Sequence, residues 1–291
     1  MIFDINHRTL YRYSQTVTQS QHLVHMSPRA CVHQKTLHHT LMLDPAPASR
    51  FDGHDAFGNP ITILDLESPH KEFILHARSA IERSKPQDRD LSKTTPWDAL
   101  DEHLYAAGSP VDLDIVQFRC TSKLTFPSVE IAAYSAQSFR PGRPVLDAAF
   151  DLTRRVFRDF KFDPNATDVS TPISQVFRQR RGVCQDFAHL TLACLRSLRV
   201  PARYVSGYIL TRPPPGQAKL QGTDASHAWI SVWAPETGWC DFDPTNGLIV
   251  TDEHIVIAHG RDYNDVSPIS GVLLGGGEHT VAVAVDVDAR Q

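Results

Sequence analysis

The chain has 291 residues, of which 41% are hydrophobic and 21% charged, and its formal net charge at pH 7 is −4. This length suggests about two domains, and the composition is that of an ordinary globular protein with enough apolar material for buried cores. The absence of a basic excess argues against nucleic acid or an anionic membrane as a partner, and no apolar run reaches the roughly 18 residues of a membrane span.

The cysteine content also restricts the class of protein. Five cysteines without a C-x-x-C pair fit neither a disulfide framework nor a zinc site. The N-terminus lacks the charged and then apolar pattern of a signal peptide. We therefore expect a cytoplasmic protein with reduced thiols, no metal and no membrane association, and an oligomeric state that the sequence leaves open.

Residues 1–135 are expected to form a β-rich, sandwich-like domain. Short alternating or β-branched runs separated by turn signals predict strands at 9–13, 40–43, 61–64 and 73–82. Two histidine pairs, His22 with His25 and His38 with His39, could be metal ligands. Without cysteines or carboxylates at ligand spacing, solvated strand histidines are the favoured interpretation. We find no chemistry in this half.

Residues 136–291 are expected to form a second, α+β domain. After a polar connection or lid over 84–109, helical spacing predicts a helix from Val145, and Thr171-Pro172 suggests the start of another. A strand follows at 202–210, and the proline-rich segment 211–224 is expected to be a mobile surface loop. Strands are then predicted at 226–233, 239–243, 253–258 and 279–287. Helices followed by an antiparallel sheet give an α+β fold.

Between these helices and strands, one cysteine stands at the start of an apolar helix. Gly182-Val183-Cys184 precedes a run with a wide apolar face that ends at Pro201. A thiol at a helix N-terminus lies near unpaired N–H groups and the positive end of the helix dipole, which favour its thiolate. By itself, Cys184 is equally well explained as a small buried hydrophobic residue.

The hairpin at 226–243 supplies two further polar groups. If Trp233 pairs with Trp239 across the short loop, Trp229 faces Asp243, and His227 lies one diagonal step from Asp243 on the same face. Diagonal neighbours are roughly 7–8 Å apart, a distance that an imidazole and a carboxylate can bridge. Taken singly, His227 is a strand histidine and Asp243 a turn aspartate. Together with Cys184 they match the nucleophile, base and orienting acid of thiol catalysis.

These motifs resemble those of the transglutaminase-like superfamily of papain-type thiol enzymes. The segments that carry the resemblance are 182–188, Ser226-His227-Ala228-Trp229, Trp239 with 242–245, and 201–208. The first 135 residues, with Tyr11-x-Tyr13, Ser27-Pro28-Arg29 and Phe57-Gly58-Asn59, are similar to the N-terminal region of bacterial members. The resemblance covers both halves of the chain.

The resemblance implies a papain-like catalytic domain over 136–291 with Cys184 as nucleophile, His227 as base and Asp243 as third member. It also implies an oxyanion hole that uses the Cys184 backbone N–H and an upstream side chain. Animal transglutaminases use a tryptophan there, but none lies between Trp97 and Cys184, which leaves Gln175, Gln179 or a first-domain residue. Acid-rich calcium loops are absent, so no cofactor is expected.

Three functions remain open from the sequence. The first is hydrolysis of peptide or amide bonds in a peptide, protein or small amide substrate, through a thioester. The second is acyl transfer of the transglutaminase type, in which an amine resolves that thioester. The third is a non-catalytic protein-binding module on the same fold, which the complete triad disfavours.

Overall fold

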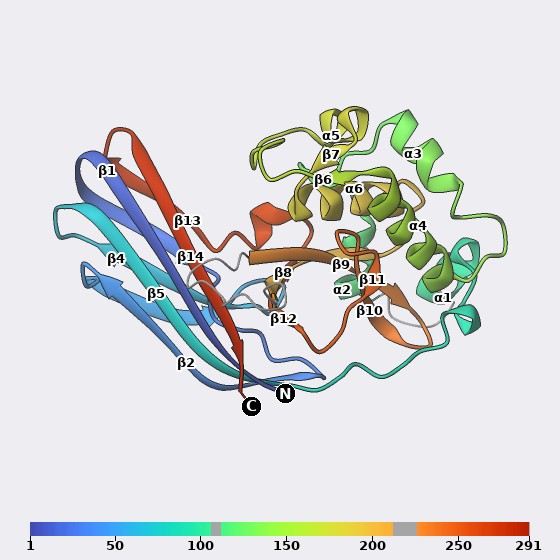
Figure 1. The fold of residues 1–291 in the computed structure, drawn as a ribbon, viewed down its shortest axis with the longest axis horizontal. Coiled ribbons are helices and arrows are strands. Elements are labelled where there is room, and N and C mark those ends of the chain that lie inside the picture. Colours follow the sequence, from blue (N-terminus) through green and yellow to red (C-terminus); the bar gives the residue numbers. More distant parts are fainter. Residues whose placement is uncertain (106–111, 212–225, 291) are drawn as a thin grey trace, which may run out of the picture.

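The computed structural model describes residues 1–105, 112–211 and 226–290. Two antiparallel sheets and a group of helices make an α+β fold, as the sequence predicts (Figure 1). Among the described residues, no helix has both the length and the apolar character that a membrane span requires. The predicted loop at 211–224 lies almost entirely outside the described residues.

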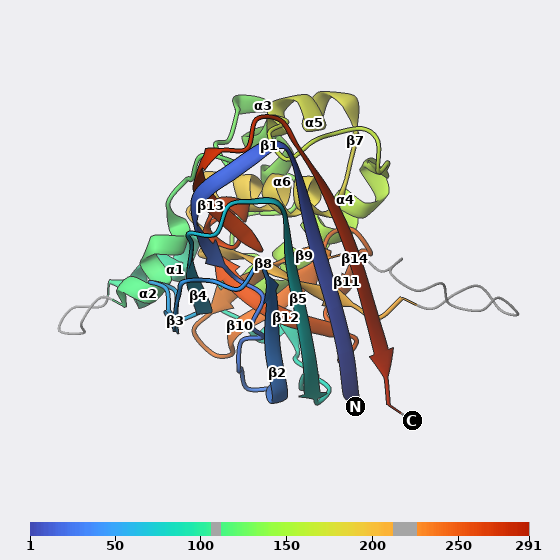
Figure 2. The same ribbon diagram turned by 90° about the vertical axis from the view of Figure 1, so that its left-hand side faces the viewer.

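The first sheet has seven strands and forms most of the β-rich region. Its order is β2-β5-β1-β4-β3, with β13 and β14 also paired to β1. The strands are β1 (Ile2–Val24), β2 (Gln34–Asp44), β3 (Ser49–His54), β4 (Pro60–Leu66), β5 (His70–Arg83), β13 (Ile269–Gly275) and β14 (His279–Ala289). All are antiparallel to their neighbours, and together they form one curled sheet (Figures 1 and 2).

The C-terminal strands return to the first sheet, which differs from the expected boundary at residue 135. The segment β14 pairs with β1 from Phe3↔Ala289 to Tyr13↔His279, and β13 continues along the same edge to Val24↔Ile269. The two termini therefore lie side by side, where the Arg290 backbone N–H donates to the Ile2 carbonyl. Strand alternation alone predicted the last strand but not its partner, because the paired residues are between 266 (279 − 13) and 286 (289 − 3) positions apart in the sequence.

Short helical segments connect the first sheet to the second half of the chain. They are η1 (Leu91–Lys93), η2 (Trp97–Ala99), α1 (Leu100–Leu104), α2 (Leu113–Val116), η3 (Gln117–Arg119) and α3 (Val129–Ala136). Longer helices follow in α4 (Val145–Asp159), α5 (Ile173–Gln179) and α6 (Cys184–Ser197), with the two-residue parallel strands β6 (Lys161–Phe162) and β7 (Arg181–Gly182) between them. Helix α5 begins at Ile173, directly after the Thr171-Pro172 start signal, but its N-cap is Pro172 and Thr171 does not cap it, so the N-cap that this signal predicts is wrong.

The second sheet has five strands in the order β11-β10-β9-β8-β12. They are β8 (Ala202–Ile209), β9 (Ser226–Ala234), β10 (Gly238–Asp243), β11 (Leu248–Ile249) and β12 (His254–Gly260), and η4 (Tyr263–Asp265) follows. Along β9 the side chains alternate. Ala228, Ile230 and Val232 join the core formed with α4 and α6, whereas Trp229 joins a small cluster on the opposite face.

Two of the histidines expected to be solvated are buried. His22 stacks on Phe73 with ring centroids 4.7 Å apart, and His25 hydrogen-bonds Asp55. Only the His38 side chain is exposed in the way the strand pattern suggests, since His39 bonds Ser27 and Ser79. Burial of strand faces by the curled sheet is a tertiary effect that alternation cannot reveal.

Candidate active site

Helix α6 presents Cys184 at its first position, as the sequence predicts. The helix behind it is almost wholly buried, from Asp186 to Arg196, and packs against α3, β8 and β9. The Cys184 side chain is partly buried and packs against the main core, and the thiol is free. The first N–H groups of a helix have no partner within it, so the thiol lies beside unpaired donors and the positive end of the dipole.

The N-terminus of α6 is fixed by a buried carboxylate. Asp186 Oδ2 accepts hydrogen bonds from the Val183 backbone N–H at 2.8 Å and from Thr167 Oγ1 at 2.6 Å. A Cβ on Gly182 would lie 2.6 Å from the same oxygen. Gly182 is therefore required by the close approach of Asp186, in addition to any freedom it gives to the turn.

The hairpin has the predicted register. Trp239 pairs with Trp233 and Phe242 with Ile230, so His227 and Asp243 lie on one face at the end of the hairpin. His227 Nε2 is 2.7 Å from Asp243 Oδ2, and both side chains are buried. The turn that ends β10 orients the carboxylate, because Asp243 Oδ1 accepts hydrogen bonds from the Thr245 and Asn246 backbone N–H groups.

Asp243 has two further donors that sequence reasoning did not find. His254 Nε2 lies 3.1 Å from Oδ2, and Asn246 Nδ2 donates to the same oxygen at 2.7 Å. Burial alone would raise the pKa of Asp243, but the hydrogen bonds from His227, His254 and Asn246 and the charge of His227 hold it well below its usual range. Asp243 is therefore a carboxylate at neutral pH. Neither His254 nor Asn246 belongs to a motif that would have predicted this contact.

His227 is connected to both of its expected partners. Burial lowers its pKa, but hydrogen bonds to Asp243 and Cys184, together with their charges, outweigh burial and raise the pKa of His227 to about 10. Because Nε2 is committed to Asp243, the nitrogen available to the thiol is Nδ1. The arrangement favours an imidazolium on His227, between the Asp243 carboxylate and the Cys184 sulfur.

The histidine–aspartate–histidine group also has the composition of a metal site. Ligand atoms of His227, Asp243 and His254 all lie within 4.8 Å of one another. However, both oxygens of the carboxylate already accept hydrogen bonds from neighbouring groups, and a cation would have to displace at least two of them. The contacts thus fit a hydrogen-bonded network better than a metal centre.

The remaining histidine of the α6 motif has a structural position. His189 Nε2 accepts a hydrogen bond from the Tyr263 backbone N–H at 3.1 Å, and the ring packs against Tyr204. Burial, which outweighs the charge of Asp262, lowers the pKa of His189 to about 4. His189 is therefore neutral and holds η4 against α6.

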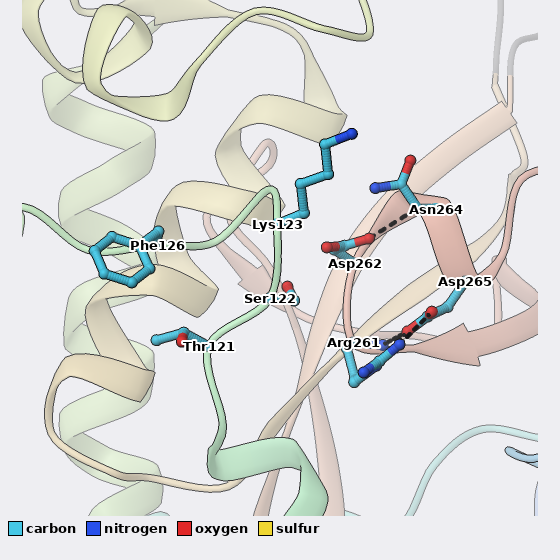
Figure 3. A pocket seen from close by; sticks show the side chains of 8 residues that line it. All are labelled: Thr121, Ser122, Lys123, Phe126, Arg261, Asp262, Asn264 and Asp265. Atoms are coloured by element: carbon cyan, nitrogen blue, oxygen red, sulfur yellow. Dashed lines mark hydrogen bonds and ion pairs between the residues drawn. The ribbon is translucent and has the colours of Figure 1, made fainter.

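A shallow pocket of about 660 Å³ lies next to η4, lined by the 121–126 segment and by residues 261–265 (Figure 3). Its charged groups are largely paired with each other. Arg261 and Asp265 form an ion pair, and Asp262 accepts hydrogen bonds from the Leu124 and Asn264 backbone N–H groups. The pocket therefore offers a polar surface without a buried charge that needs a ligand.

Comparison with known proteins assigns both halves of the chain. Residues 3–82 match the bacterial transglutaminase-like N-terminal region, and residues 132–244 match the transglutaminase-like superfamily. An uncharacterized protein of Mycobacterium tuberculosis H37Rv is 38% identical over 98% of this chain and 92% of its own length. Another uncharacterized protein, from Mycobacterium leprae, is 32% identical over 97% of this chain and 96% of its own.

Two other similarities concern the fold and a shorter segment. A crystal structure from Cytophaga hutchinsonii, described as a candidate cysteine protease, superposes with a TM-score of 0.76 at 21% identity and covers 99% of this chain and 90% of that one. The protein-glutamine gamma-glutamyltransferase of Pseudomonas aeruginosa is 34% identical over 30% of this chain and 13% of its own length. The first similarity extends over both halves and supports the two-part α+β fold.

Proposed function

Because the chain belongs to the transglutaminase-like superfamily, with the bacterial N-terminal region ahead of the core, we propose that it is a thiol-dependent hydrolase of peptide or amide bonds. Cys184 is the proposed nucleophile, His227 the base and Asp243 the group that orients His227. The observation that carries the proposal is the buried His227–Asp243 hydrogen bond of 2.7 Å, on a histidine whose other partner is the Cys184 thiol.

The proposed reaction has two steps. The Cys184 thiolate attacks the amide carbonyl carbon, His227 gives its proton to the leaving nitrogen as the C–N bond breaks, and a thioester remains. His227 then takes a proton from a water molecule whose oxygen attacks the thioester. Cleavage of the C–S bond releases the acid and restores the thiolate.

The negative oxygen that develops on the carbonyl needs preorganised donors. The Cys184 backbone N–H, at the first position of α6, has no partner within the helix and supplies one. The candidates for the second, side-chain donor are Gln175 and Gln179, which are both exposed on α5, and a residue of the first domain.

Acyl transfer to an amine is the second candidate, supported by the similarity of a segment to the Pseudomonas aeruginosa glutamyltransferase. A glutamine-containing peptide, incubated with and without a primary amine, distinguishes the candidates. Hydrolysis releases the free acid in both incubations, whereas transfer yields the amine conjugate when the amine is present. Both products should disappear in Cys184→Ala and persist in Cys120→Ala.

Thiol reactivity tests the nucleophile without a known substrate. At pH 6 to 7, iodoacetamide should alkylate Cys184 faster than the more exposed Cys120, because only Cys184 is paired with an imidazolium. Burial raises the pKa values of Cys194 and Cys240 to about 12, so both should stay unmodified in the folded protein. Mass spectrometry of tryptic peptides measures each site.

The non-catalytic alternative makes the opposite prediction for the same experiment. If Cys120 is modified first across this pH range and Cys184 behaves as an ordinary thiol, the pair with His227 does not exist and the fold serves binding. The His227→Ala variant provides the internal control, since it should slow alkylation of Cys184 and leave that of Cys120 unchanged.

A further inference from the structure

A second cavity, of about 490 Å³, lies between the first sheet and the β9–β10 hairpin, away from the Cys184 thiol. Its walls come from β5, β8, β10, β12 and the segments that flank them. The Trp229 ring lies between this cavity and the His227–Asp243 pair. It contacts the rings of His227 and His254, while its Nε1 donates to Asp241, which lines the cavity. The volume is in the range of small-molecule sites.

Arg203 lines this cavity, and its guanidinium forms no ion pair with the described residues. Its carbon lies 4.2 Å from the centre of the Trp239 ring, so the two groups are stacked. Its Nε is buried and makes no hydrogen bond, and in the described chain the guanidinium has neither a hydrogen bond nor an ion pair. A stacked guanidinium is preorganised, with its remaining N–H groups free to bind a ligand.

Two more side-chain nitrogen atoms in the cavity wall, Arg83 Nε and His259 Nδ1, are buried without a hydrogen-bond partner. Arg83, at the end of β5, is 3% exposed, yet its Nε makes no hydrogen bond and its Nη1 reaches only the Cys31 sulfur at 3.6 Å. His259 on β12 is 4% exposed, and its Nδ1 is likewise unpaired. Burial and the charges of Arg203, Arg29 and Arg83 keep the pKa of His259 well below its ordinary value, so its imidazole is neutral.

The carboxylates of the wall compensate these cations only in part, since the charge of Asp241 raises the pKa of Arg203 but does not outweigh the effect of burial. Asp241 is bonded to Trp229 Nε1, and no ion pair joins it to Arg83 or Arg203 in the described residues. Asp88 pairs with Lys85 at the solvent-exposed rim. Buried cations and buried N–H groups without partners are unfavourable, and a bound ion, water or ligand is one of the ways in which native proteins satisfy them.

We propose that this cavity is a binding site for a small organic anion, a carboxylate or phosphate monoester carried on an apolar body. Arg203 and Arg83 bind the anionic group and His259 supplies a further donor, because charge-assisted bonds to guanidinium groups are the strongest that the wall offers. The stacked Trp239 and the side chains of Val250 and Val256 accommodate the apolar body. The site is separate from the proposed hydrolase centre and does not depend on it.

The cavity also contacts the neighbourhood of Asp243 on one side. Thr251 lines it, and the Thr251 backbone N–H and hydroxyl lie 3.4 Å from His254 Nδ1. Thr251 would therefore separate a bound anion from His254, which hydrogen-bonds Asp243.

Calorimetric titration of the full chain tests the proposal with four probes of defined charge. We expect benzoate or phenyl phosphate to bind with one-to-one stoichiometry. Benzamide, which has the shape of benzoate without its charge, and inorganic phosphate, which lacks the apolar body, should each bind at least about tenfold more weakly. Saturable binding that is equal for benzoate and benzamide, or no saturable binding of either anion at millimolar concentration, would overturn the site.

Variants locate the binding. Arg203→Met keeps the length of the side chain and should weaken benzoate binding about tenfold or more, whereas Arg8→Met, at an exposed arginine on β1, should leave it unchanged. Cys184→Ala should bind as the unmodified chain does, even if the protein proves not to hydrolyse amides. Undiminished binding in folded Arg203→Met, or loss of binding in folded Cys184→Ala, contradicts the proposal. If Arg203→Met fails to fold, the comparison of benzoate with benzamide on the unmodified chain decides.

Discussion

Asp243 is the residue on which most of the candidate site depends, and its contacts in the structure change the effect on stability that we expect from Asp243→Asn. Its Oδ2 receives three side-chain donors and its Oδ1 two backbone donors, all in a buried position. From the hairpin alone, one expects Asp243→Asn to keep the thermal midpoint. The asparagine amide nitrogen, however, is itself a donor. In place of one carboxylate oxygen it would face the donors of His227, His254 and Asn246 or of the backbone, and those hydrogen bonds would be lost.

We therefore predict that Asp243→Asn lowers both turnover and stability. An unpaired buried donor costs about 1–3 kcal/mol, so the free energy of unfolding should fall by at least that amount. Turnover should fall deeply, though by less than the roughly 10⁴-fold seen for the equivalent change in serine proteases, because a thiol is easier to ionise. Urea denaturation and steady-state kinetics on the peptide substrate measure the two effects. Full activity would mean that another group orients His227.

His254 offers a separate test of the same network. We predict that His254→Phe, which removes the donor to Asp243, lowers kcat several-fold with little change in KM, because His254 is buried and contacts Asp243. His254→Gln keeps a donor and should recover part of the loss. Equal kcat values in the two variants would show that His254 acts through packing and not through its hydrogen bond to Asp243. The matched control is His38→Gln, at an exposed strand position.

How far the sequence predicts the site depends on whether each contact is local. The pairing of Trp233 with Trp239 and the diagonal from His227 to Asp243 follow from the hairpin loop, and the structure has that register. The helix that begins at Cys184 is equally local. His254 lies on β12, which β8 and β9 separate from β10 in the sheet, so no local spacing rule predicts its contact with Asp243.

Among the elements, the start of α6 depends on a glycine that no side chain can replace without moving Asp186. A Cβ at Gly182 would fall 2.6 Å from Asp186 Oδ2 and 2.9 Å from its Cβ. We predict that Gly182→Ala destabilises the protein by about 1–2 kcal/mol through loss of the helix cap and slows turnover more than stability alone explains, since Cys184 moves with the helix end.

A second glycine provides the control for that variant. Gly142 lies in a turn at φ 73° with open space around its Cβ direction, so Gly142→Ala meets only the backbone penalty of the left-handed region. Its stability should fall by about 1 kcal/mol while turnover stays the same. Urea denaturation with activity measured on each folded variant separates the two. Equal effects on turnover would show that Gly182 has no special relation to the thiol.

The elements also show where pattern reasoning ends. Alternation located strands in β1, β2, β4 and β5, but not the 23-residue length of β1, which persists because four other strands pair along it. The last strand, β14, was expected and its sheet was not, and β13 was not expected at all. Period and turn signals describe a strand and its hairpin, whereas the pairing of β14 with β1 is decided by burial of Val285 and Val287 against Phe3 and Ile5 in the common core.

At the scale of the whole molecule, the two sheets are joined by buried polar contacts as well as by the core. His7 Nδ1 on β1 lies 2.6 Å from Tyr208 Oη on β8, and Thr9 Oγ1 bonds the other ring nitrogen of His7. Gln34 and Asn59 from the first sheet and its turn bond the backbone of Val256 and His259 on β12. These contacts place first-sheet residues against the wall of the second cavity, which requires both halves of the chain.

Three buried histidines make this assembly sensitive to acid. Burial lowers the pKa values of His7, His22 and His189 to about 4 in the folded protein, from 6.5 in the unfolded chain. Between pH 6.5 and 4 the unfolded chain therefore binds protons at these positions and the folded protein does not. Each histidine reduces the free energy of unfolding by up to about 1.4 kcal/mol per pH unit as the pH falls through this window, and none does so above it.

We predict that His7→Gln removes the contribution of one histidine to the fall of unfolding free energy with falling pH. Glutamine retains a polar partner for Tyr208 but does not titrate, so the slope of unfolding free energy against pH should be shallower by up to about 1.4 kcal/mol per pH unit between 6.5 and 4, with no change in slope above pH 7. Urea denaturation at half-unit pH steps measures it. His38→Gln, at an exposed histidine on β2, is the matched control and should keep the original slope. If His7→Gln and the unmodified chain lose stability in parallel as the pH falls, His7 takes up its proton in the folded state. The His7 imidazole would then not be neutral where it contacts Tyr208 between the two sheets.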